Sequence, residues 1–308
     1  MRRFKFPASH SLGLPALILL SLFIFMPLLS VIRYATWQWS GLSEPQSVGF
    51  ANFLRFAHDR ELWRALKTTL FFALITLPGF LYLSRIIAEA IEGTRFERFI
   101  KALLFMPSLI TIGGAAIAWY LLYNPNYGFI VELSRKLTYN LPCEVTLLQR
   151  EVWLPCDGIA LPWDSKPWAA LLYISLFSLW QTVGYGVLVT SAALKSIPSA
   201  VQEAARVDGA NENQIRRFII GPLLRPSFVF LLIVGTVFVL QSYSAVFLLT
   251  RGAPYGSTEV LGYYLYKTSF ERFELGYGAA ITLAILALTL AIATLQARFL
   301  QRKDSDFT

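Results

Sequence analysis

Charged residues are scarce in this chain of 308 residues. Asp, Glu, Lys and Arg together make up 15% of it, whereas hydrophobic residues make up 56%. An ordinary soluble domain has about 25% charged and roughly 45–50% apolar residues. Because a soluble protein needs polar residues to cover its surface, the composition argues against a soluble enzyme and against a disordered tail. It favours a membrane protein with several spans.

Cysteine and histidine are nearly absent, which excludes several kinds of site. Cys143 and Cys156 are too few for a disulfide-rich scaffold and lack the spacing of metal ligands. His10 and His58 cannot form an H-E-x-x-H zinc site, and no G-x-x-x-x-G-K-[ST] segment occurs. We therefore expect no metal, no catalytic residue and no ATP-binding loop in this chain.

Long apolar segments, in contrast, are abundant. A helix that crosses a bilayer needs about 20 mostly apolar residues. Six segments qualify: Leu12–Ile32, Leu66–Ile91, Ala102–Tyr123, Trp168–Leu194, Phe228–Leu249 and Gly276–Leu300. They predict an all-α, polytopic membrane protein with six transmembrane helices.

The spans divide the chain as follows. We expect a cytoplasmic N-terminus over residues 1–11, a first helix with its outer loop over 12–65, a core transmembrane domain over 66–300 and a cytoplasmic C-terminus over 301–308. Six spans place both termini on one side, and a cytoplasmic N-terminus puts most Lys and Arg of the loops on the inner side, as is usual in membranes. The net charge of +8 is thus interpreted as an orientation signal, and no nucleic-acid partner is expected. Arg85 and Glu89 are interpreted as an interfacial pair near the end of the second span.

The predicted outer loops contain two local features. Residues 50–56 are amphipathic and predict a surface helix. Residues 124–167 form a periplasmic loop that contains both cysteines, and a disulfide between Cys143 and Cys156 is chemically permitted there. The alternative is two unrelated thiols.

The segment 196–226, between the fourth and fifth spans, is too polar to lie in lipid. Ser199 followed by Gln202 has the pattern of a helix N-cap. Asp208 and Gly209 then end this helix, because glycine readily adopts the left-handed cap conformation.

A second short helix follows in the same segment. Asn211 is a good N-cap for it, with Gln214 at the third helical position. Pro222 is expected to end it. The segment thus predicts a helix–turn–helix outside the membrane.

The order Glu-Ala-Ala, three residues, Gly, and a closing Pro resembles the EAA loop of binding-protein-dependent ABC importer permeases. In that family the loop is a pair of short coupling helices that dock on an ATPase subunit. The matching positions are Glu203, Ala204, Ala205, Asp208, Gly209 and Pro222. One departure is Gly221, where the family usually has Leu.

The resemblance covers residues 14–302 and is strongest to carbohydrate-type permeases, in particular the first permease of maltose- and glycerol-3-phosphate-type heterodimers. It implies a type I ABC importer permease fold in a bacterial or archaeal plasma membrane. It also implies a second permease subunit, an ATPase dimer that binds ATP and Mg, and an extracytoplasmic solute-binding protein.

Polar side chains recur on one face of the fourth span. Ser178, Gln181, Thr182 and Tyr185 follow an i, i+3, i+4, i+7 pattern, and polar groups within a span tend to face protein or a water-filled path. Alignment with the maltose-type permease places its sugar-contacting positions on these four residues and on Gly235, Val239 and Ser242. The alternative is that these groups only join neighbouring helices.

The resemblance thus predicts a permease subunit that forms half of the translocation pathway for a sugar, sugar-like or polyol solute, of the oligosaccharide, glycoside-osmolyte or glycerol-3-phosphate type. A permease for a non-carbohydrate solute is the nearest alternative. A membrane-embedded enzyme lacks a catalytic set of His, Cys or paired acids in the spans. A stand-alone secondary transporter would be expected to carry Asp, Glu or Arg at the span centres.

Overall fold

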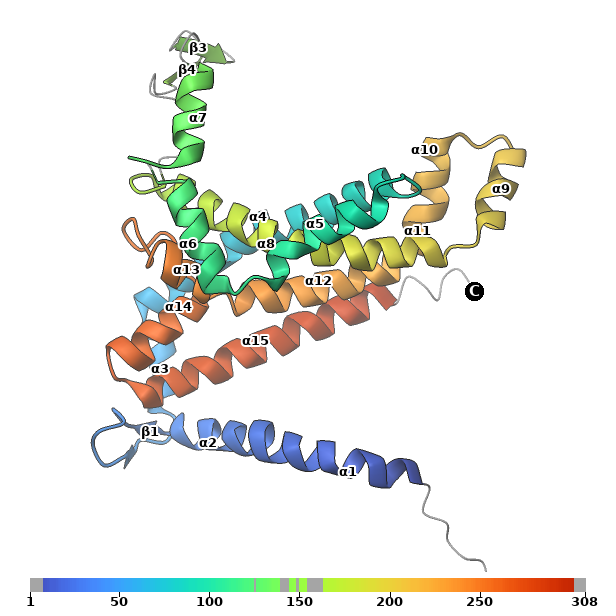
Figure 1. Cartoon of the computed structure of the whole chain (residues 1–308). Coiled ribbons are helices and arrows are strands. Elements are labelled where there is room, and N and C mark those ends of the chain that lie inside the picture. Colours follow the sequence, from blue (N-terminus) through green and yellow to red (C-terminus); the bar gives the residue numbers. More distant parts are fainter. Residues whose placement is uncertain (1–7, 125, 139–143, 148–149, 154–162, 302–308) are drawn as a thin grey trace, which may run out of the picture. The chain divides into compact units, whose positions relative to one another are not determined.

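The computed structural model describes residues 8–124, 126–138, 144–147, 150–153 and 163–301. Within these residues the chain is almost entirely helical (Figure 1), as predicted, apart from two small two-stranded antiparallel sheets. The chain divides into two compact units, and each is described by itself.

The first unit contains the chain up to Leu62 together with Tyr264–Leu288. Its elements are α1 (Ala8–Leu20), a π-helical turn (Ser21–Phe25), α2 (Met26–Tyr34), β1 (Trp37–Gln38), β2 (Gln46–Ser47), α3 (Ala51–Arg55), the 3-10 turn Phe56–His58 and, after a π-helical turn (Lys267–Glu271), the first part of α15 (Leu275–Gln301). The short helix α3 confirms the predicted surface helix. A side-chain Cβ at Gly276 would lie 1.8 Å from the carbonyl oxygen of Trp37, so the start of α15 packs directly on the β1 backbone.

The second unit contains Trp63–Tyr263 and the chain from Thr289. Its elements are α4 (Arg60–Ile91), α5 (Glu97–Leu109), α6 (Ile112–Leu122), α7 (Phe129–Thr138), β3 (Glu144–Leu147), β4 (Arg150–Trp153), α8 (Pro167–Ser196), α9 (Ser199–Val207), α10 (Glu212–Gln214), a π-helical turn (Ile215–Ile220), α11 (Gly221–Leu223), α12 (Arg225–Leu240) and α13 (Ser244–Leu249). The first residues of α4 belong to the first unit, and α14 (Leu261–Tyr266) crosses the boundary between the two.

Four helices of the described residues are long and apolar enough to cross a membrane, namely Gly13–Tyr34, Arg60–Ile91, Pro167–Ser196 and Leu275–Arg298. Two bent helix pairs raise the number to six if each pair is counted as one span. The first, second, fourth and sixth predicted spans therefore correspond to continuous helices.

The third predicted span, Ala102–Tyr123, is not one helix. It consists of α5 and α6, which meet at an angle of 101°, and Ile110 between them has extended backbone dihedral angles. Pro107 lies in the last turn of α5, and the Ser108 hydroxyl donates a 2.6 Å hydrogen bond to the carbonyl of Gln181 on α8. The break is thus held by a tertiary contact that hydropathy does not reveal.

The fifth predicted span, Phe228–Leu249, is also interrupted. Helix α12 ends at Leu240, and α13 begins only at Ser244. The polar residues between them leave the helical path where a Cβ on Gly262 would lie 3.1 Å from the Ser242 carbonyl oxygen. The close approach of Gly262 therefore fixes the backbone at the break.

Two predicted helix boundaries in segment 196–226 are wrong. Ser199 is the first helical residue rather than the N-cap, because Pro198 and the residue before it have extended dihedral angles. Pro222 does not end the second helix, which continues to Leu223 before bending by 62° into α12. The π-helical turn before Pro222 widens the helix and gives the proline ring room.

Candidate functional site

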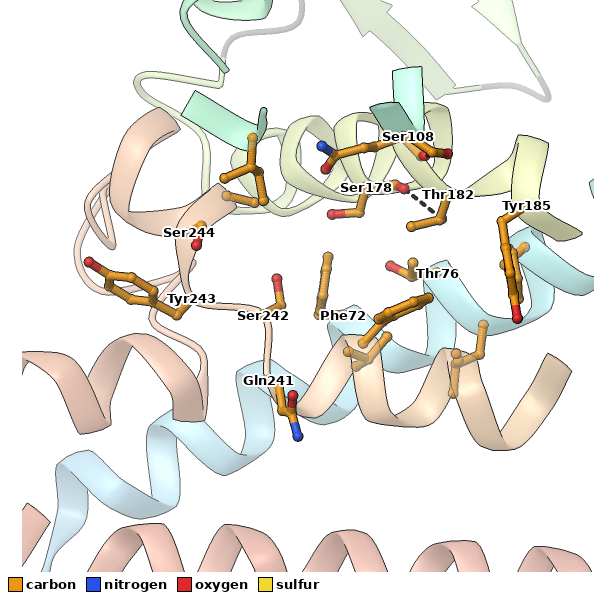
Figure 2. Close-up of a pocket in the computed structure, with 18 of the residues that line it drawn as sticks. Phe72, Thr76, Ser108, Ser178, Thr182, Tyr185, Gln241, Ser242, Tyr243 and Ser244 are labelled. Carbon is orange, nitrogen blue, oxygen red and sulfur yellow. Dashed lines mark hydrogen bonds between the residues drawn. The ribbon is translucent and has the colours of Figure 1, made fainter. Parts of the chain in front are cut away.

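A cavity of about 520 Å³ lies in the second unit. Its walls come from α4, from the break between α5 and α6, from α8, from α12 and from the residues that follow α12 (Figure 2). The two interruptions of the predicted spans thus both border this space.

All the residues that the sequence assigned to a solute path line this one cavity. Helix α8 contributes four of them, α12 contributes two and the break after α12 contributes one: Ser178, Gln181, Thr182, Tyr185, Gly235, Val239 and Ser242. The structure therefore brings the predicted face of α8 together with the α12 positions. Contact of these residues with a solute stays a prediction.

The hydroxyl groups on the α8 face are bonded to their own helix. Ser178 donates to the carbonyl of Ile174 at 2.8 Å. Thr182 donates to the carbonyl of Ser178 at 2.7 Å, the dashed line in Figure 2. Each hydroxyl has one proton and two lone pairs. With the proton used within the helix, each oxygen can only accept hydrogen bonds from a molecule in the cavity.

Sequence reasoning missed the wall that α4 supplies. Phe72, Thr76 and Phe80 line the cavity from this helix, and the Thr76 hydroxyl is buried with no hydrogen-bond partner. These three residues belong to a stripe of buried residues at a spacing of four, which continues to Ser84 and which the structure reveals. The Thr76 oxygen is enclosed by protein in this structure, so a ligand hydroxyl would satisfy it only after the neighbouring wall side chains shift.

The cavity is polar and aromatic but uncharged. Phe105, Phe238 and Tyr243 add further aromatic rings to its lining, and Gln241 adds an amide. None of the described lining residues is Asp, Glu, Lys, Arg or His. Such a lining suits a neutral molecule with both hydroxyl groups and apolar ring faces.

The segment 196–226 lies at one end of the second unit, where α9 and α10 project beyond the ends of α5 and α8 (Figure 1). In α9, Glu203 and Ala204 are exposed and Ala205 is buried. Asp208 is the C-cap, and Gly209 has a φ of +83° in open space, since a Cβ on it would meet no atom within 4 Å. The glycine is therefore required by the turn and not by crowding within this chain.

The second helix of the segment is capped as the sequence predicted. The Asn211 side chain accepts a 2.9 Å hydrogen bond from the backbone amide of Gln214, whose side chain accepts a 2.8 Å bond from the Asn211 amide. An ion pair of 2.9 Å between Arg206 and Glu212 joins the two short helices. Pro222 is exposed. The helix–turn–helix is thus fixed by its own local interactions.

Four large apolar side chains of this segment are exposed. Val207 at the end of α9 is 88% exposed and Phe218 after α10 is 66% exposed, and Val201 and Leu223 are less so. They leave apolar surface on an otherwise polar projection that is available for contact with a partner.

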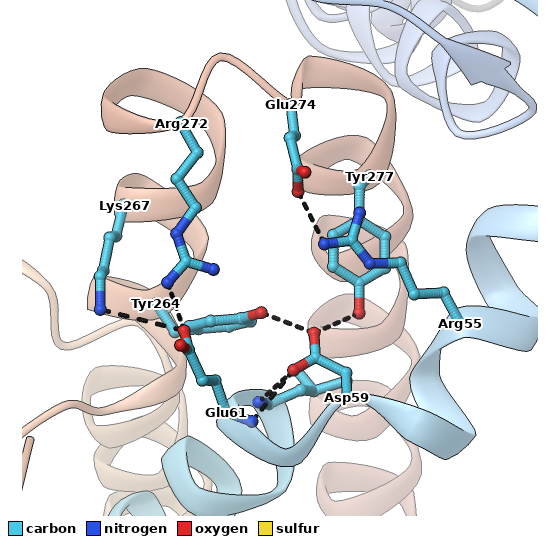
Figure 3. Close-up of polar contacts among 9 residues, drawn as sticks. Arg55, Asp59, Glu61, Tyr264, Lys267, Arg272, Glu274 and Tyr277 are labelled. Carbon is cyan, nitrogen blue, oxygen red and sulfur yellow. Dashed lines mark hydrogen bonds and ion pairs between the residues drawn. The ribbon is translucent and has the colours of Figure 1, made fainter.

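The first unit contains a separate cluster of charged and phenolic groups (Figure 3). Asp59, at the start of α4, accepts 2.6 Å hydrogen bonds from the hydroxyls of Tyr264 and Tyr277 and two more from backbone amides. Burial raises the pKa of Asp59, but these four hydrogen bonds outweigh it and hold the pKa below its ordinary value of 3.8. Ion pairs surround the group: Glu61 with Arg272 and Lys267, and Glu274 with Arg55.

Two further predictions concern cysteines and metals. Cys143 and Cys156 lie outside the described residues. Among the residues that the structure does describe, no three His, Cys, Asp or Glu side chains converge as metal ligands.

Comparison with known proteins gives consistent results. A family model described as "Binding-protein-dependent transport system inner membrane component" matches residues 56–305. A probable ABC transporter permease protein of Pyrococcus horikoshii is 29% identical, over 91% of this chain and 90% of the relative. The sulfoquinovosyl glycerol transport system permease protein SmoG of Agrobacterium fabrum is 29% identical (94% and 89%), and the sn-glycerol-3-phosphate transport system permease protein UgpA of Yersinia enterocolitica is 28% identical (96% and 94%).

A solved structure has a similar fold. It is a bacterial ABC transporter involved in the import of the acidic polysaccharide alginate, with a TM-score of 0.78 and 19% identity over 96% of this chain and 95% of that chain. At this level of identity the likeness establishes a shared fold.

Proposed function

Since this chain belongs to the inner membrane components of binding-protein-dependent transport systems, we propose that it forms half of the translocation pathway for an uncharged sugar, glycoside or polyol. Its status as a permease subunit of an ABC importer is the premise, and the class of solute is the proposal. The observation that carries the proposal is the uncharged cavity lined by all the predicted pathway residues.

The chemistry of the cavity supports a polyhydroxylated solute. Ser178 and Thr182 present oxygen acceptors toward the cavity because their protons are used within α8. Phe72, Phe80 and Tyr185 supply ring surfaces. Sugar hydroxyls donate hydrogen bonds and sugar rings have apolar faces, so both features of such a solute find a match.

The names of the relatives also support this class. They refer to sn-glycerol-3-phosphate and to sulfoquinovosyl glycerol, and the similar structure imports alginate. These compounds share a polyhydroxylated carbon skeleton. They also carry acidic groups, for which the described lining of this cavity offers no cationic partner. We therefore propose for this chain a solute that shares the polyhydroxylated skeleton of these compounds but carries no negative charge.

The energy source is proposed to lie on other subunits. Segment 196–226 would dock on an ATPase dimer that binds ATP and Mg, through the residues carried over from the family motif: Glu203, Ala204, Ala205, Asp208, Gly209 and Pro222. The exposed Val207 and the open turn at Gly209 support a docking role. A second permease and an extracytoplasmic binding protein complete the complex, with both termini of this chain and segment 196–226 in the cytoplasm.

The test uses the whole complex in proteoliposomes, with the binding protein supplied outside and ATP supplied inside. Uptake is measured for a neutral disaccharide, a neutral glycoside, glycerol-3-phosphate and an amino acid. ATP-dependent uptake of a neutral compound in preference to the other two is the expected result. Preferential uptake of glycerol-3-phosphate or of the amino acid would overturn the proposed solute class. Accumulation along an ion gradient by this chain alone, without ATP, would overturn the coupling proposal.

A further inference from the structure

An ion pair fastens the beginning of segment 196–226 to the corner between α4 and α5. Lys195, in the last turn of α8, lies 2.6 Å from the Glu97 carboxylate at the start of α5. The same carboxylate pairs with Lys101 at 2.6 Å and accepts a hydrogen bond from the Gly93 amide. The Glu97 side chain is only 12% exposed, whereas Lys195 is 57% exposed, so the carboxylate is enclosed and the pair is open to solvent on the lysine side.

A second contact fastens the second short helix of the segment to the same corner. Arg85, near the end of α4, pairs with Glu89 at 2.7 Å through Nε. Its Nη2 donates a 3.3 Å hydrogen bond to the backbone carbonyl of Arg216, in the π-helical turn after α10. The pair predicted from sequence is therefore present, and the arginine does more than reach the interface.

Gly221 makes room for this second contact. Its backbone is helical, with a φ of −56°, so the conformation does not require glycine. A Cβ there would lie 3.2 Å from the Arg216 carbonyl oxygen and 3.5 Å from Arg85 Nη2. A longer side chain would have to displace the guanidinium. Gly221, the one position in this segment that departs from the family motif, thus lies beside the Arg85 side chain.

An apolar core underlies both contacts. Ala88 and Ile91 of α4, Leu194 of α8, Ala205 of α9 and Ile215 after α10 belong to one buried cluster. Helix α4 also supplies Phe72 and Thr76 to the cavity, and α8 supplies its polar face. The corner is therefore continuous with two walls of the cavity.

We propose that Arg85 and Glu97 are positioning residues that clamp the start and the second short helix of segment 196–226 to the α4–α5 corner, residues 85–101, so that the segment and the corner move as one body. A displacement of the segment would then pass directly into α4 and α8, since a packed, hydrogen-bonded unit transmits movement that a loose loop would absorb. This inference rests on the proposed coupling role of the segment.

The test measures solute taken up per ATP hydrolysed in the reconstituted complex. Arg85→Gln and Glu97→Gln each remove one clamp, and we expect this ratio to fall about threefold to tenfold. ATPase copurification and the solute concentration at half-maximal uptake should stay unchanged. Lys136→Gln is the matched control, because Lys136 forms an exposed 3.7 Å pair with Glu132 on α7, away from the corner.

A double-mutant cycle separates positioning from general destabilisation. Gly221→Leu should lower the ratio to the same extent as Arg85→Gln, and the combined variant should be no worse than either alone, because both act on one contact. Full additivity, or wild-type ratios in both single variants, would overturn the inference. If the wild-type chain does not copurify with an ATPase, the proposed coupling role itself fails. The two failures can therefore be told apart.

Discussion

The cavity and the two charged clusters use hydrogen bonds in opposite ways. In the cavity, Ser178 and Thr182 donate to carbonyls of their own helix. In the α4–α5 corner, Lys195 and Arg85 bond to elements other than their own, and in the first unit Asp59 joins the start of α4 to two tyrosines more than 200 residues away in sequence.

The difference has a mechanical consequence. Ser178 and Thr182 bond within α8, so α8 can move away from α4 and α12 without breaking these two bonds, whereas the Ser108 hydroxyl ties α5 to α8 through the Gln181 carbonyl. Separating the corner from segment 196–226 would break the Lys195–Glu97 ion pair and the Arg85–Arg216 hydrogen bond, because both contacts join different elements. We infer that opening of the pathway takes place between the walls, while the corner and segment 196–226 keep their structure.

The largest effect is expected where the fixed segment meets another subunit. Gly209→Trp should lower uptake by about tenfold or more, equivalent to roughly 1.4 kcal/mol. Within this chain the new side chain meets nothing at Cβ, but the φ of +83° strains it, so the loss would combine backbone strain in the turn with a clash at the docking surface. ATP-driven uptake in proteoliposomes measures it.

Gly209→Asn is the control for this variant, because asparagine tolerates a positive φ far better than tryptophan does. It should retain most of the uptake. If both variants insert normally and transport like the wild type, segment 196–226 is not a docking element. The inference that it transmits movement to the cavity walls then fails as well.

A smaller effect is expected in the cavity, where two serines of α8 form a matched pair. Ser175 and Ser178 each donate to the carbonyl four residues earlier, at 2.7 and 2.8 Å, but only Ser178 lines the cavity. Ser178→Ala should raise the solute concentration at half-maximal uptake about threefold, the loss expected for one hydrogen bond. Ser175→Ala should leave it unchanged, and equal effects would show that the lining position is irrelevant.

Local chemistry predicted much of this molecule. The period of polar residues on α8 indicated the cavity face, and the Asn211 cap was correct because a capping box depends on residues three apart. The interruptions at Ile110 and Gln241 were missed because other helices impose them, through Ser108 on the Gln181 carbonyl and through Gly262 against Ser242. At Ile110 the surrounding sequence is a continuous apolar run, and at Gln241 the short polar stretch was assigned to the outer end of an unbroken span.

The α4 wall was missed for a different reason. Thr76 lies in a strongly apolar span, where a threonine is readily accommodated by bonding back to its own helix. Its partnerless hydroxyl is a property of the folded cavity and could not be deduced from sequence spacing.

Replacement of Thr76 should change stability and transport in opposite directions. Thr76→Val removes a buried, partnerless hydroxyl and should stabilise the purified, solute-free permease by about 1 kcal/mol. The same change should weaken solute-dependent uptake, because the oxygen that a solute would satisfy is gone. Thermal unfolding in detergent and uptake kinetics measure the two effects.

Thr69→Val is the counterpart on the same helix. Thr69 donates to the Ala65 carbonyl and accepts from the Leu261 amide, each at 2.8 Å, so its replacement should destabilise the permease. A destabilised Thr76→Val variant would mean that the hydroxyl already has a partner in the folded protein, and the assignment of Thr76 to the solute would fall.

The smallest expected effect is a difference in pH dependence: the stability contribution of the charged cluster around Asp59 should change with pH, and solute binding in the neutral cavity should not. Because the folded pKa of Asp59 lies below its ordinary value of 3.8, its ionised form favours the folded state. That contribution is complete above about pH 5 and is lost as the pH falls through the folded pKa. The thermal midpoint of the wild type should therefore approach that of Asp59→Asn on acidification from pH 6 to pH 3.5.

The difference in solute affinity between Ser178→Ala and Ser175→Ala should stay constant between pH 6 and pH 8, since no charged group lines the described cavity wall. Parallel midpoint curves for the wild type and Asp59→Asn would mean that the tyrosine hydrogen bonds do not stabilise the ionised carboxylate, and the contrast between charged and neutral bonding would lose its first-unit example.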